Sequence, residues 1–419
     1  MSAGSSGLAT RSYDIITVGG GIAASALARA MAERGAKVLV LEREKQFKDR
    51  VRGEAVVSWG VAEANELGIC SLLKEKCAHD VPHVEGGAGV RDLRATTPQQ
   101  SPLLSFPHQV MQETLLAAAE NAGAEVRRGV SVERVEAGVE PVVVVSGHNV
   151  NGHSVDRQNH ERIPARLVVG ADGRDSAVRK WAGFSVCEQG NDLYMAGVLL
   201  TNLRASTEIM YAVFNPEIGT WTGLIPQAGD QWRAYFVYPK TMGYRLQGEA
   251  MLGQFIRESA RGYAPMADYL VDAKSIGPLA SFDASDKWVE HPYHDGVALV
   301  GDAAATTDPT YGQGLSFALR AARVLRDELT NNSDWDAAGH RYAEQHQQSF
   351  HACHVVEGWF RKLFQDPSPE SAALRTKAMP LIAEDPTRVP DHIFSGPRLA
   401  LKRTSAGAVV WRMLIPFLR

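Results

Sequence analysis

The sequence lacks several features that would place it in other protein classes. Its 419 residues include only four cysteines, and their spacing matches neither a paired metal site nor a disulfide-rich scaffold. No apolar run approaches the roughly 20 residues that a membrane-spanning helix requires. Basic and acidic side chains nearly balance, 44 against 48, which gives no general attraction to nucleic acid. We expect a reduced, cytoplasmic protein without a bound metal or a nucleic-acid partner.

The two ends of the chain carry no clear targeting signal. Residues 1–12 are small and polar and lack the basic stretch and apolar core of a signal peptide, so we expect a flexible leader. Near the other end, Ala406–Leu418 is apolar but contains Arg412 and Pro416. We expect this segment to pack on the protein's own surface, and contact with a membrane surface is the less favoured alternative.

The N-terminal segment predicts a strand, a glycine turn, a helix and a second, parallel strand. Tyr13–Val18 is β-branched and apolar, and Lys37–Glu42 has the continuous apolar character of a buried strand. Between them, Ile22–Arg34 carries Ala and Leu at helical spacing and stops at Gly35. This βαβ pattern is typical of the start of a nucleotide-binding domain.

The turn between strand and helix has the pattern G-x-G-x-x-A of a dinucleotide-binding fingerprint. A pyrophosphate would lie at the helix N-terminus, where free N–H groups and the helix dipole favour anions. Glu42 ends the second strand with the spacing expected of a ribose-binding acid. Alone, this motif does not separate NAD from FAD. The predicted nucleotide-binding residues are Gly19, Gly20, Gly21, Ile22, Ala23, Ala24, Glu42 and Arg43.

A second motif far along the chain favours FAD. A buried strand ends in Gly301-Asp302, and a helix is expected to begin after Gly312, with Gly314 and Leu315 in its first turn. An acid at a strand end can bind ribityl hydroxyls, and helix N–H groups can face the flavin edge where negative charge collects on reduction. A simple strand, loop and helix with a capping aspartate is the alternative interpretation.

Between these motifs lies Gly170-Ala171-Asp172-Gly173. The three motifs, in this order, resemble those of the class A flavoprotein monooxygenases, the group that includes the para-hydroxybenzoate hydroxylase-like enzymes. The resemblance covers residues 13–330. It implies an α/β fold in which a three-layer, Rossmann-like FAD/NAD(P)-binding domain carries an inserted β-rich substrate domain and C-terminal helices.

The order of expected elements predicts discontinuous domains. We assign residues 1–81, 107–185 and 291–330 to the FAD-binding domain, residues 82–106 and 186–290 to the substrate domain, and residues 331–419 to a C-terminal helical region. Within the first domain the sequence predicts a helix at Gln109–Gly123, a single strand at Ala124–Val135, and a hairpin from Pro141–Ser146 and Ile163–Val169.

The resemblance also implies an activity. FAD, bound tightly but not covalently, would be reduced by NADPH or NADH and would react with O₂. The resulting flavin C4a-hydroperoxide would hydroxylate or epoxidise an apolar small molecule, with aromatic and polycyclic compounds of secondary metabolism favoured. Supply of electrons by a separate flavin reductase stays open.

Several residue roles follow from the same resemblance. Asp172 and Gly173 would support binding of FAD and of the nicotinamide nucleotide, Asp302 would bind the ribityl chain, and Pro309 would line the reacting face of the flavin as the one catalytic candidate. Arg52 would approach the FAD, with a surface ion pair as its alternative role. Gln112 would lie near the FAD phosphates, or be an ordinary solvated helix residue.

Departures from the family pattern leave alternatives open. Many relatives have a histidine after Gly-Asp-Ala-Ala, where this chain has Ala305, so no catalytic histidine is predicted there. Trp221, with Ile225 and Pro226, keeps the ends of the Trp-x-Trp-x-Ile-Pro signature of flavin-dependent halogenases but lacks the second tryptophan. We expect Trp221 in the core or the substrate pocket. A halogenase and a geranylgeranyl-reductase-like enzyme remain alternatives, and a non-enzymatic flavin-binding redox sensor is the least favoured.

Overall fold

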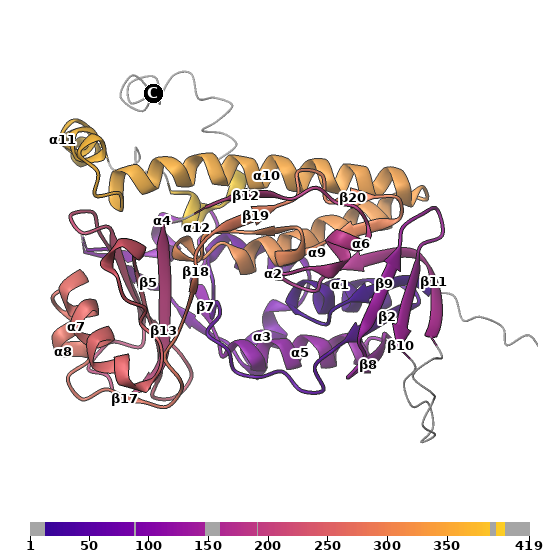
Figure 1. Cartoon of the computed structure of the whole chain (residues 1–419), viewed down its shortest axis with the longest axis horizontal. Coiled ribbons are helices and arrows are strands. Elements are labelled where there is room, and N and C mark those ends of the chain that lie inside the picture. Colours follow the sequence, from indigo (N-terminus) through magenta and orange to yellow (C-terminus); the bar gives the residue numbers. More distant parts are fainter. Residues whose placement is uncertain (1–12, 88, 147–159, 191, 386–390, 399–419) are drawn as a thin grey trace, which may run out of the picture.

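The computed structural model describes residues 13–87, 89–146, 160–190, 192–385 and 391–398. The expected N-terminal leader and the apolar segment near the C-terminus lie outside the described residues. The molecule is elongated, with one large sheet at each end and a long helix, α10 (Trp335–Phe364), running along both (Figure 1). The predicted fold class, an α/β FAD-binding domain with a β-rich insertion and C-terminal helices, is confirmed.

The first sheet is built around the N-terminal strand. Strand β1 (Tyr13–Val18) pairs in parallel with β2 (Val38–Glu42) on one side and with β11 (His160–Gly170) on the other. The side chains of β1 and β2 are buried on both faces, with Ile15 to Val18 and Val38 to Glu42 all buried, as continuous apolar runs predict. The full order is β20-β21-β11-β1-β2-β8, where the further strands are β20 (Tyr293–His294), β21 (Val297–Leu299) and β8 (Glu125–Arg128).

One predicted strand is wrong in its extent. Ala124–Val135 forms two strands, β8 and β9 (Val132–Glu136), which are separated at Gly129 with a φ of +72°. A left-handed residue ends the extended chain, so β8 pairs with β2 and β9 turns away to pair with β10 (Val142–Ser146). The predicted hairpin is confirmed, because β10 pairs antiparallel with β11.

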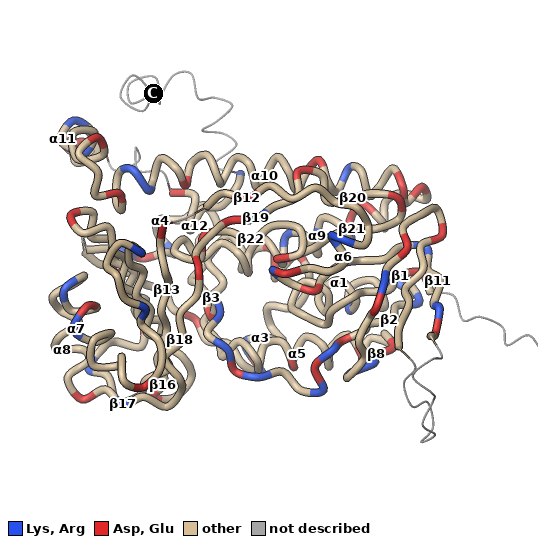
Figure 2. The backbone as a smooth tube through the Cα atoms, viewed as in Figure 1, with Lys and Arg blue, Asp and Glu red and all other residues tan. Residues whose placement is uncertain are grey.

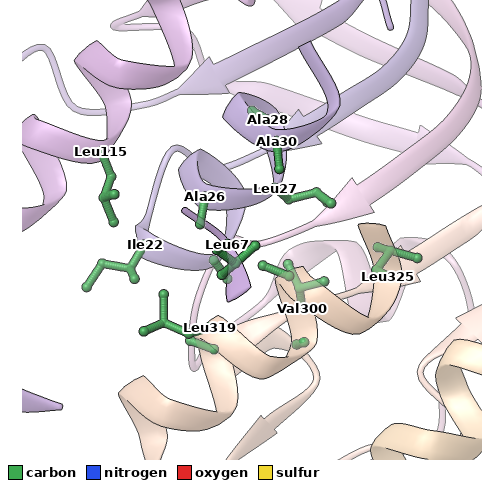
Figure 3. Close-up of a cluster of buried hydrophobic side chains, with 14 of the residues drawn as sticks. Ile22, Ala26, Leu27, Ala28, Ala30, Leu67, Leu115, Val300, Leu319 and Leu325 are labelled. Carbon is green, nitrogen blue, oxygen red and sulfur yellow. The ribbon is translucent and has the colours of Figure 1, made fainter. Parts of the chain in front are cut away.

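Helices cover the first sheet through small and aliphatic side chains. Helix α1 (Ile22–Ala32) packs between α5 (His108–Asn121) and α9 (Gly314–Asn331), and Figure 3 shows Ile22 of α1 close to Leu319 of α9. Ala24 and Ala28 of α1 are fully buried, which allows the helix to lie close to the strands. The turn before α1 is therefore held rigidly against the sheet.

The second sheet is mainly antiparallel and has one open face toward the first. Its opposite face packs on helix α7 (Leu252–Gly262) and the short α8 (Met266–Tyr269) through a core that includes Trp232, Phe236 and Phe255. Its order is β17-β13-β16-β15-β14-β5-β6, with β18 beside β13. The strands are β5 (His83–Glu85), β6 (Val90–Asp92), β13 (Leu193–Thr201), β14 (Ile209–Asn215), β15 (Thr220–Pro226), β16 (Gln231–Pro239), β17 (Lys274–Ser275) and β18 (Ala280–Asp283).

Two three-stranded sheets lie between the large ones. The first has β7 (Leu103–Ser105) in the centre, between β3 (Ala55–Val56) and β4 (His79–Val81). The second has β19 (Asp286–Trp288) in the centre, between β12 (Cys187–Gln189) and β22 (Ala305–Thr306). Segments of both predicted domains therefore share small sheets at their junction.

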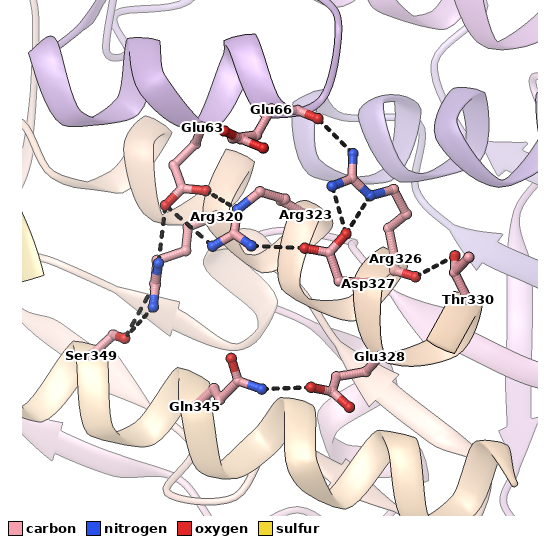
Figure 4. Close-up of polar contacts among 10 residues, drawn as sticks. All are labelled: Glu63, Glu66, Arg320, Arg323, Arg326, Asp327, Glu328, Thr330, Gln345 and Ser349. Carbon is pink, nitrogen blue, oxygen red and sulfur yellow. Dashed lines mark hydrogen bonds and ion pairs between the residues drawn. The ribbon is translucent and has the colours of Figure 1, made fainter. Parts of the chain in front are cut away.

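A charged cluster joins three helices behind the first sheet. Glu63 of α2 (Ser58–Glu66) accepts hydrogen bonds from Arg320 and Arg323 of α9, and Arg320 also donates to Ser349 of α10 (Figure 4). The C-terminal region continues with α11 (Pro369–Glu384) and α12 (His392–Ser395). Among the described helices, none combines the length and the apolar character needed to cross a membrane.

Candidate active site

A large cavity, with a volume of about 1650 Å³, lies between the two sheets. Its wall brings together all the residues predicted for the cofactor and substrate sites except Gly20, which lies inside the first turn. The predicted residues on the wall are Gly19, Gly21, Ile22, Ala23, Ala24, Glu42, Arg43, Arg52, Gln112, Asp172, Gly173, Asp302, Pro309, Gly312, Gly314, Leu315 and Trp221.

The first glycine turn places the N-terminus of α1 at the cavity. Gly19 has a φ of +100°, and a side chain there would meet the carbonyl oxygen of Ala171 at 2.5 Å, so only glycine fits. In front of Gly21 nothing lies within 4 Å of the position that a Cβ would take. Helix α1 starts with no side-chain cap and no acid in its first turn. Its free N–H groups therefore form a cradle for an anion.

Glu42 holds this turn in shape. Its carboxylate is buried and accepts hydrogen bonds from the backbone N–H groups of Gly20 and Glu44, each at 2.7 Å. A carboxylate offers about four lone-pair sites, so these two bonds leave capacity for a hydroxyl group at the cavity wall.

A second helix N-terminus faces the same cavity. Gly312, with a φ of +62°, has open space in front of it, and α9 begins at Gly314 without a side-chain cap or an early acid. The capping aspartate of this region is Asp308, whose Oδ1 accepts a hydrogen bond from the N–H of Thr310. Asp302 lies on the cavity wall, and Arg52 Nη1 is 3.9 Å from its Oδ2. Desolvation raises the pKa of Asp302, whereas the nearby guanidinium groups lower it.

The two carboxylate oxygens of Asp172 differ in their hydrogen bonding. Its Oδ2 accepts hydrogen bonds from the N–H groups of Ala177 and Val178, at 2.6 and 3.1 Å, and so caps helix α6 (Ala177–Trp181). Its Oδ1 is buried and has no partner among the described residues. A buried acceptor without a donor is costly unless a bound group satisfies it, so this atom fits a cofactor hydroxyl or water at the cavity wall.

The sequence did not identify the residues that anchor the loop carrying Arg52. Arg233 of β16 donates to both oxygens of Glu54, at 2.7 and 2.9 Å, and also to Asp49 at 2.9 Å. The side chains of Arg233 and Glu54 are each only 1% exposed. Burial raises the pKa of the Glu54 carboxyl, and the charge and hydrogen bonds of Arg233 limit that rise. Figure 2 shows the charged residues along this loop between β2 and β3.

Two further contacts fix the same loop. The hydroxyl of Tyr235 donates to the carbonyl oxygen of Arg52, and the Nδ1 of His108 lies 2.7 Å from the carbonyl oxygen of Gly53. Burial lowers the pKa of His108 to about 4, so its imidazole is neutral at physiological pH. Because the partners come from β16 and α5, Arg52 is held at the junction of the two sheets.

Beyond Pro309 the cavity becomes apolar and aromatic. Trp221 is 3% exposed and packs near Phe214, whose ring also stacks on Tyr311 with centroids 6.0 Å apart. Trp221 belongs to a buried hydrophobic cluster and also lines the cavity. We call this part of the cavity the apolar chamber, and its wall includes Met195, Met210, Ala212, Phe214, Trp221, Tyr235, Phe282, Tyr311, Phe360, Phe364, Ile393 and Phe394.

The similarity of this sequence to a known protein family identifies the family. Residues 12–341 match the family described as FAD binding domain. The chain belongs to this FAD-binding family. The residues present fit the cofactor, because two uncapped helix N-termini, an unpartnered carboxylate oxygen and two open glycine positions share one cavity. Among the described residues, no group of metal-binding side chains gathers at this site or elsewhere.

This flavoprotein is similar in sequence to two relatives of known name and similar in fold to one solved structure. It is 27% identical over 401 residues to 6-methylpretetramide 4-monooxygenase from Streptomyces rimosus, and the alignment covers 89% of each chain. It is 24% identical over 321 residues to digeranylgeranylglycerophospholipid reductase 2 from Methanococcoides burtonii, and the alignment covers 74% of this chain and 73% of the relative. Its fold matches that of p-nitrophenol 4-monooxygenase from Pseudomonas putida, with a TM-score of 0.74, 19% identity, and 92% and 97% of the two chains covered. The resemblance to class A flavoprotein monooxygenases is confirmed, and the enzyme is an FAD-dependent oxidoreductase of that type.

Proposed function

We propose that this flavoprotein uses electrons from NADPH or NADH, together with O₂, to hydroxylate or epoxidise an aromatic or polycyclic small molecule. The observation that carries the proposal is the continuity of one cavity from two helix N-termini to the apolar chamber. Ligand sites commonly measure about 300–1,000 Å³. The cavity, at about 1650 Å³, has room for a dinucleotide and a second molecule beside it.

The cofactor half of the cavity would bind several parts of FAD. The backbone from Gly19 to Ala24 would hold the pyrophosphate, and Glu42 would accept a hydrogen bond from a ribose hydroxyl. Asp302 would bind the ribityl chain, and the N–H groups at the start of α9 would face the electron-rich edge of the flavin. When bound, FAD supplies the redox and oxygen chemistry that no side chain of this site provides.

The protein's own contribution is positioning and exclusion of water. Arg52, fixed by its backbone contact with Tyr235, would bring a positive charge near the cofactor. Pro309, which lines the cavity, would contact the reacting face of the flavin. The aromatic side chains of the chamber would hold a flat ring by stacking and edge contacts, and their apolar surface would keep water from the reacting atoms.

The relatives supply both the support and the main alternative. A relative that covers 89% of this chain is named a monooxygenase, which favours oxygen insertion. A second relative is named a reductase of an isoprenoid lipid, so saturation of a carbon–carbon double bond is the competing activity. The two activities differ in whether O₂ is consumed and whether its oxygen enters the product.

Two experiments separate these activities. In the first, the FAD-loaded enzyme is mixed with NADPH or NADH without oxygen, and bleaching of the flavin absorbance is expected. If neither nucleotide bleaches the flavin, even with aromatic compounds present, a separate reductase must supply the electrons. In the second, polycyclic compounds are incubated with labelled O₂, and mass spectrometry is expected to find one labelled oxygen atom per product. A saturated product without label, or a halogenated one, would contradict the proposal.

A further inference from the structure

The wall of the apolar chamber carries very little charge, and that charge is paired. Outside the cofactor segments 42–54, 172–175 and residue 302, the ionised side chains on the described cavity wall are Arg91, Asp283 and Asp391. Lys240 lies 2.6 Å from Asp283. Arg91 and Asp391 form a bidentate pair, with Nη1–Oδ1 and Nη2–Oδ2 distances of 3.1 and 2.8 Å. A ligand that enters the chamber therefore meets no uncompensated charge on this part of the wall.

The Arg91–Asp391 pair uses most of the hydrogen-bonding capacity of the guanidinium group. Besides Asp391, Arg91 donates from Nε to the hydroxyl of Thr96 at 2.7 Å and from Nη2 to the carbonyl oxygen of Thr96 at 3.2 Å. These contacts engage four of the five N–H donors of an arginine. The side chain of Asp391 is 18% exposed, and Arg91 holds the pKa of that carboxyl below its usual range, so the pair stays ionised at neutral pH.

The pair also joins distant parts of the chamber wall. Arg91 belongs to β6 at the edge of the second sheet, and Asp391 directly precedes α12. Phe394 of α12 lies under the Arg91 guanidinium at 5.5 Å and lines the chamber as well. The hydroxyl of Ser395 donates to Asp391 at 2.5 Å. Asp391 and Thr96 thus hold the Arg91 guanidinium next to an aromatic residue of the chamber wall.

We propose that Asp391 withholds the Arg91 guanidinium from ligands, so that the chamber selects an uncharged, planar polycyclic compound and discriminates against a carboxylate-bearing one. The inference rests on the proposed function insofar as the chamber is the substrate site. It adds a specificity-determining pair to that site. Removal of the Asp391 charge would leave a cation with free donors beside the ring, which is the group that a carboxylate binds best.

The test compares two compounds with the same ring system, of which only one carries a carboxylate. The probes are 1,8-dihydroxyanthraquinone and its 3-carboxylate, titrated into the FAD-loaded protein by isothermal calorimetry at neutral pH. The wild type is expected to bind the uncharged compound at least about tenfold more tightly. Asp391→Asn is expected to shift the ratio of the two dissociation constants by roughly tenfold toward the carboxylate, the effect of one charge-assisted hydrogen-bonded contact.

Two further variants separate selection by charge from a purely structural role. Asp272→Asn breaks a similar ion pair with Arg204, 2.6 Å long, that does not line the cavity, and its binding ratio is expected to equal that of the wild type. The double variant Arg91→Gln/Asp391→Asn restores a neutral wall and is expected to restore the wild-type ratio. A ratio unchanged by Asp391→Asn, or changed equally by Asp272→Asn, would overturn the proposal.

The remaining outcomes are also decisive. If Asp391→Asn does not fold, Arg91→Gln leaves the Asp391 charge in the wall and must strengthen discrimination against the carboxylate by about tenfold. A failure to do so refutes the role of the pair, and binding of neither probe by the wild type refutes the ligand class. Calorimetry is independent of turnover. Selective binding without any labelled product would therefore contradict the proposed oxygen insertion and leave the charge selection intact.

Discussion

Replacement of Arg233 by methionine tests how the loop carrying Arg52 is held. Both Arg233 and Glu54 are 1% exposed, and two hydrogen bonds join them. Methionine has a similar length but no charge, so Glu54 would remain buried without its cation. Removal of one partner from a buried ion pair costs about 3–5 kcal/mol, because the other charge is left uncompensated. We expect the free energy of unfolding to fall by that amount.

The effect of pH follows from the remaining carboxyl. Burial already raises the pKa of Glu54, and loss of Arg233 removes the main opposing influence. In Arg233→Met the folded-state pKa therefore lies above the unfolded value of about 4.3. A group whose folded pKa is raised is protonated in the folded state and releases its proton on unfolding. The variant should thus be least impaired at acidic pH and lose up to ~1.4 kcal/mol per pH unit as pH rises through the raised pKa.

The assay is urea denaturation of the wild type, Arg233→Met and the double variant Arg233→Met/Glu54→Leu, each at several pH values. The double variant removes both charges and is expected to recover most of the lost stability and to lack the added pH dependence. FAD affinity, followed by flavin fluorescence, should fall in the single variant because the loop carrying Arg52 loses its contacts with Arg233 and keeps only those with Tyr235 and His108. A single variant that loses less than about 1 kcal/mol, or a double variant no more stable than the single, would refute this reasoning.

Three shorter predictions concern the cofactor half and its support. Gly19→Ala should abolish FAD binding because the new Cβ would lie 2.5 Å from the Ala171 carbonyl oxygen. The control Gly35→Ala has a φ of +84° but no close neighbour, so it should lower the free energy of unfolding by only about 1–2 kcal/mol and still bind FAD. Asp302→Ala should weaken FAD binding by roughly tenfold or more, measured by fluorescence titration, and an unchanged affinity would remove Asp302 from the site. Glu63→Gln should lower the free energy of unfolding by about 1–3 kcal/mol, because Arg320 and Arg323 lose the negative charge that they share. A smaller loss is expected for Asp327→Asn, whose side chain is 38% exposed.

The parts of the site that could be predicted are those in which one short stretch of sequence contains every residue needed to bind a ligand group. A phosphate cradle needs two glycines and a helix start, and Gly19–Ala24 supplies them within six residues. The second cradle, from Asp302 to Leu315, is equally local. The order of these motifs then indicated the fold, because each lies at the end of a buried parallel strand.

The parts that could not be predicted depend on partners far apart in the chain. Arg233 and Glu54 are 179 residues apart, and Arg91 and Asp391 are 300 residues apart. The residues around a single arginine in a strand do not show which distant acidic residue will form an ion pair with it. The break at Gly129 has a different reason. Valines on both sides of it favour one continuous strand, and the sequence does not show that this glycine adopts a left-handed conformation.

The strand order of the first sheet has a consequence for the synthesis of the protein. Strand β1 leaves the ribosome first, yet its partner β11 begins at His160, and β21, beyond β11, begins at Val297. At about 5–20 residues per second, the roughly 280 residues between Gly19 and Asp302 take on the order of 15–60 s to make. During that time the first phosphate cradle exists without the second. FAD capture is therefore a late event, and a nascent chain must keep its apolar strands from aggregating until residues beyond Leu315 emerge.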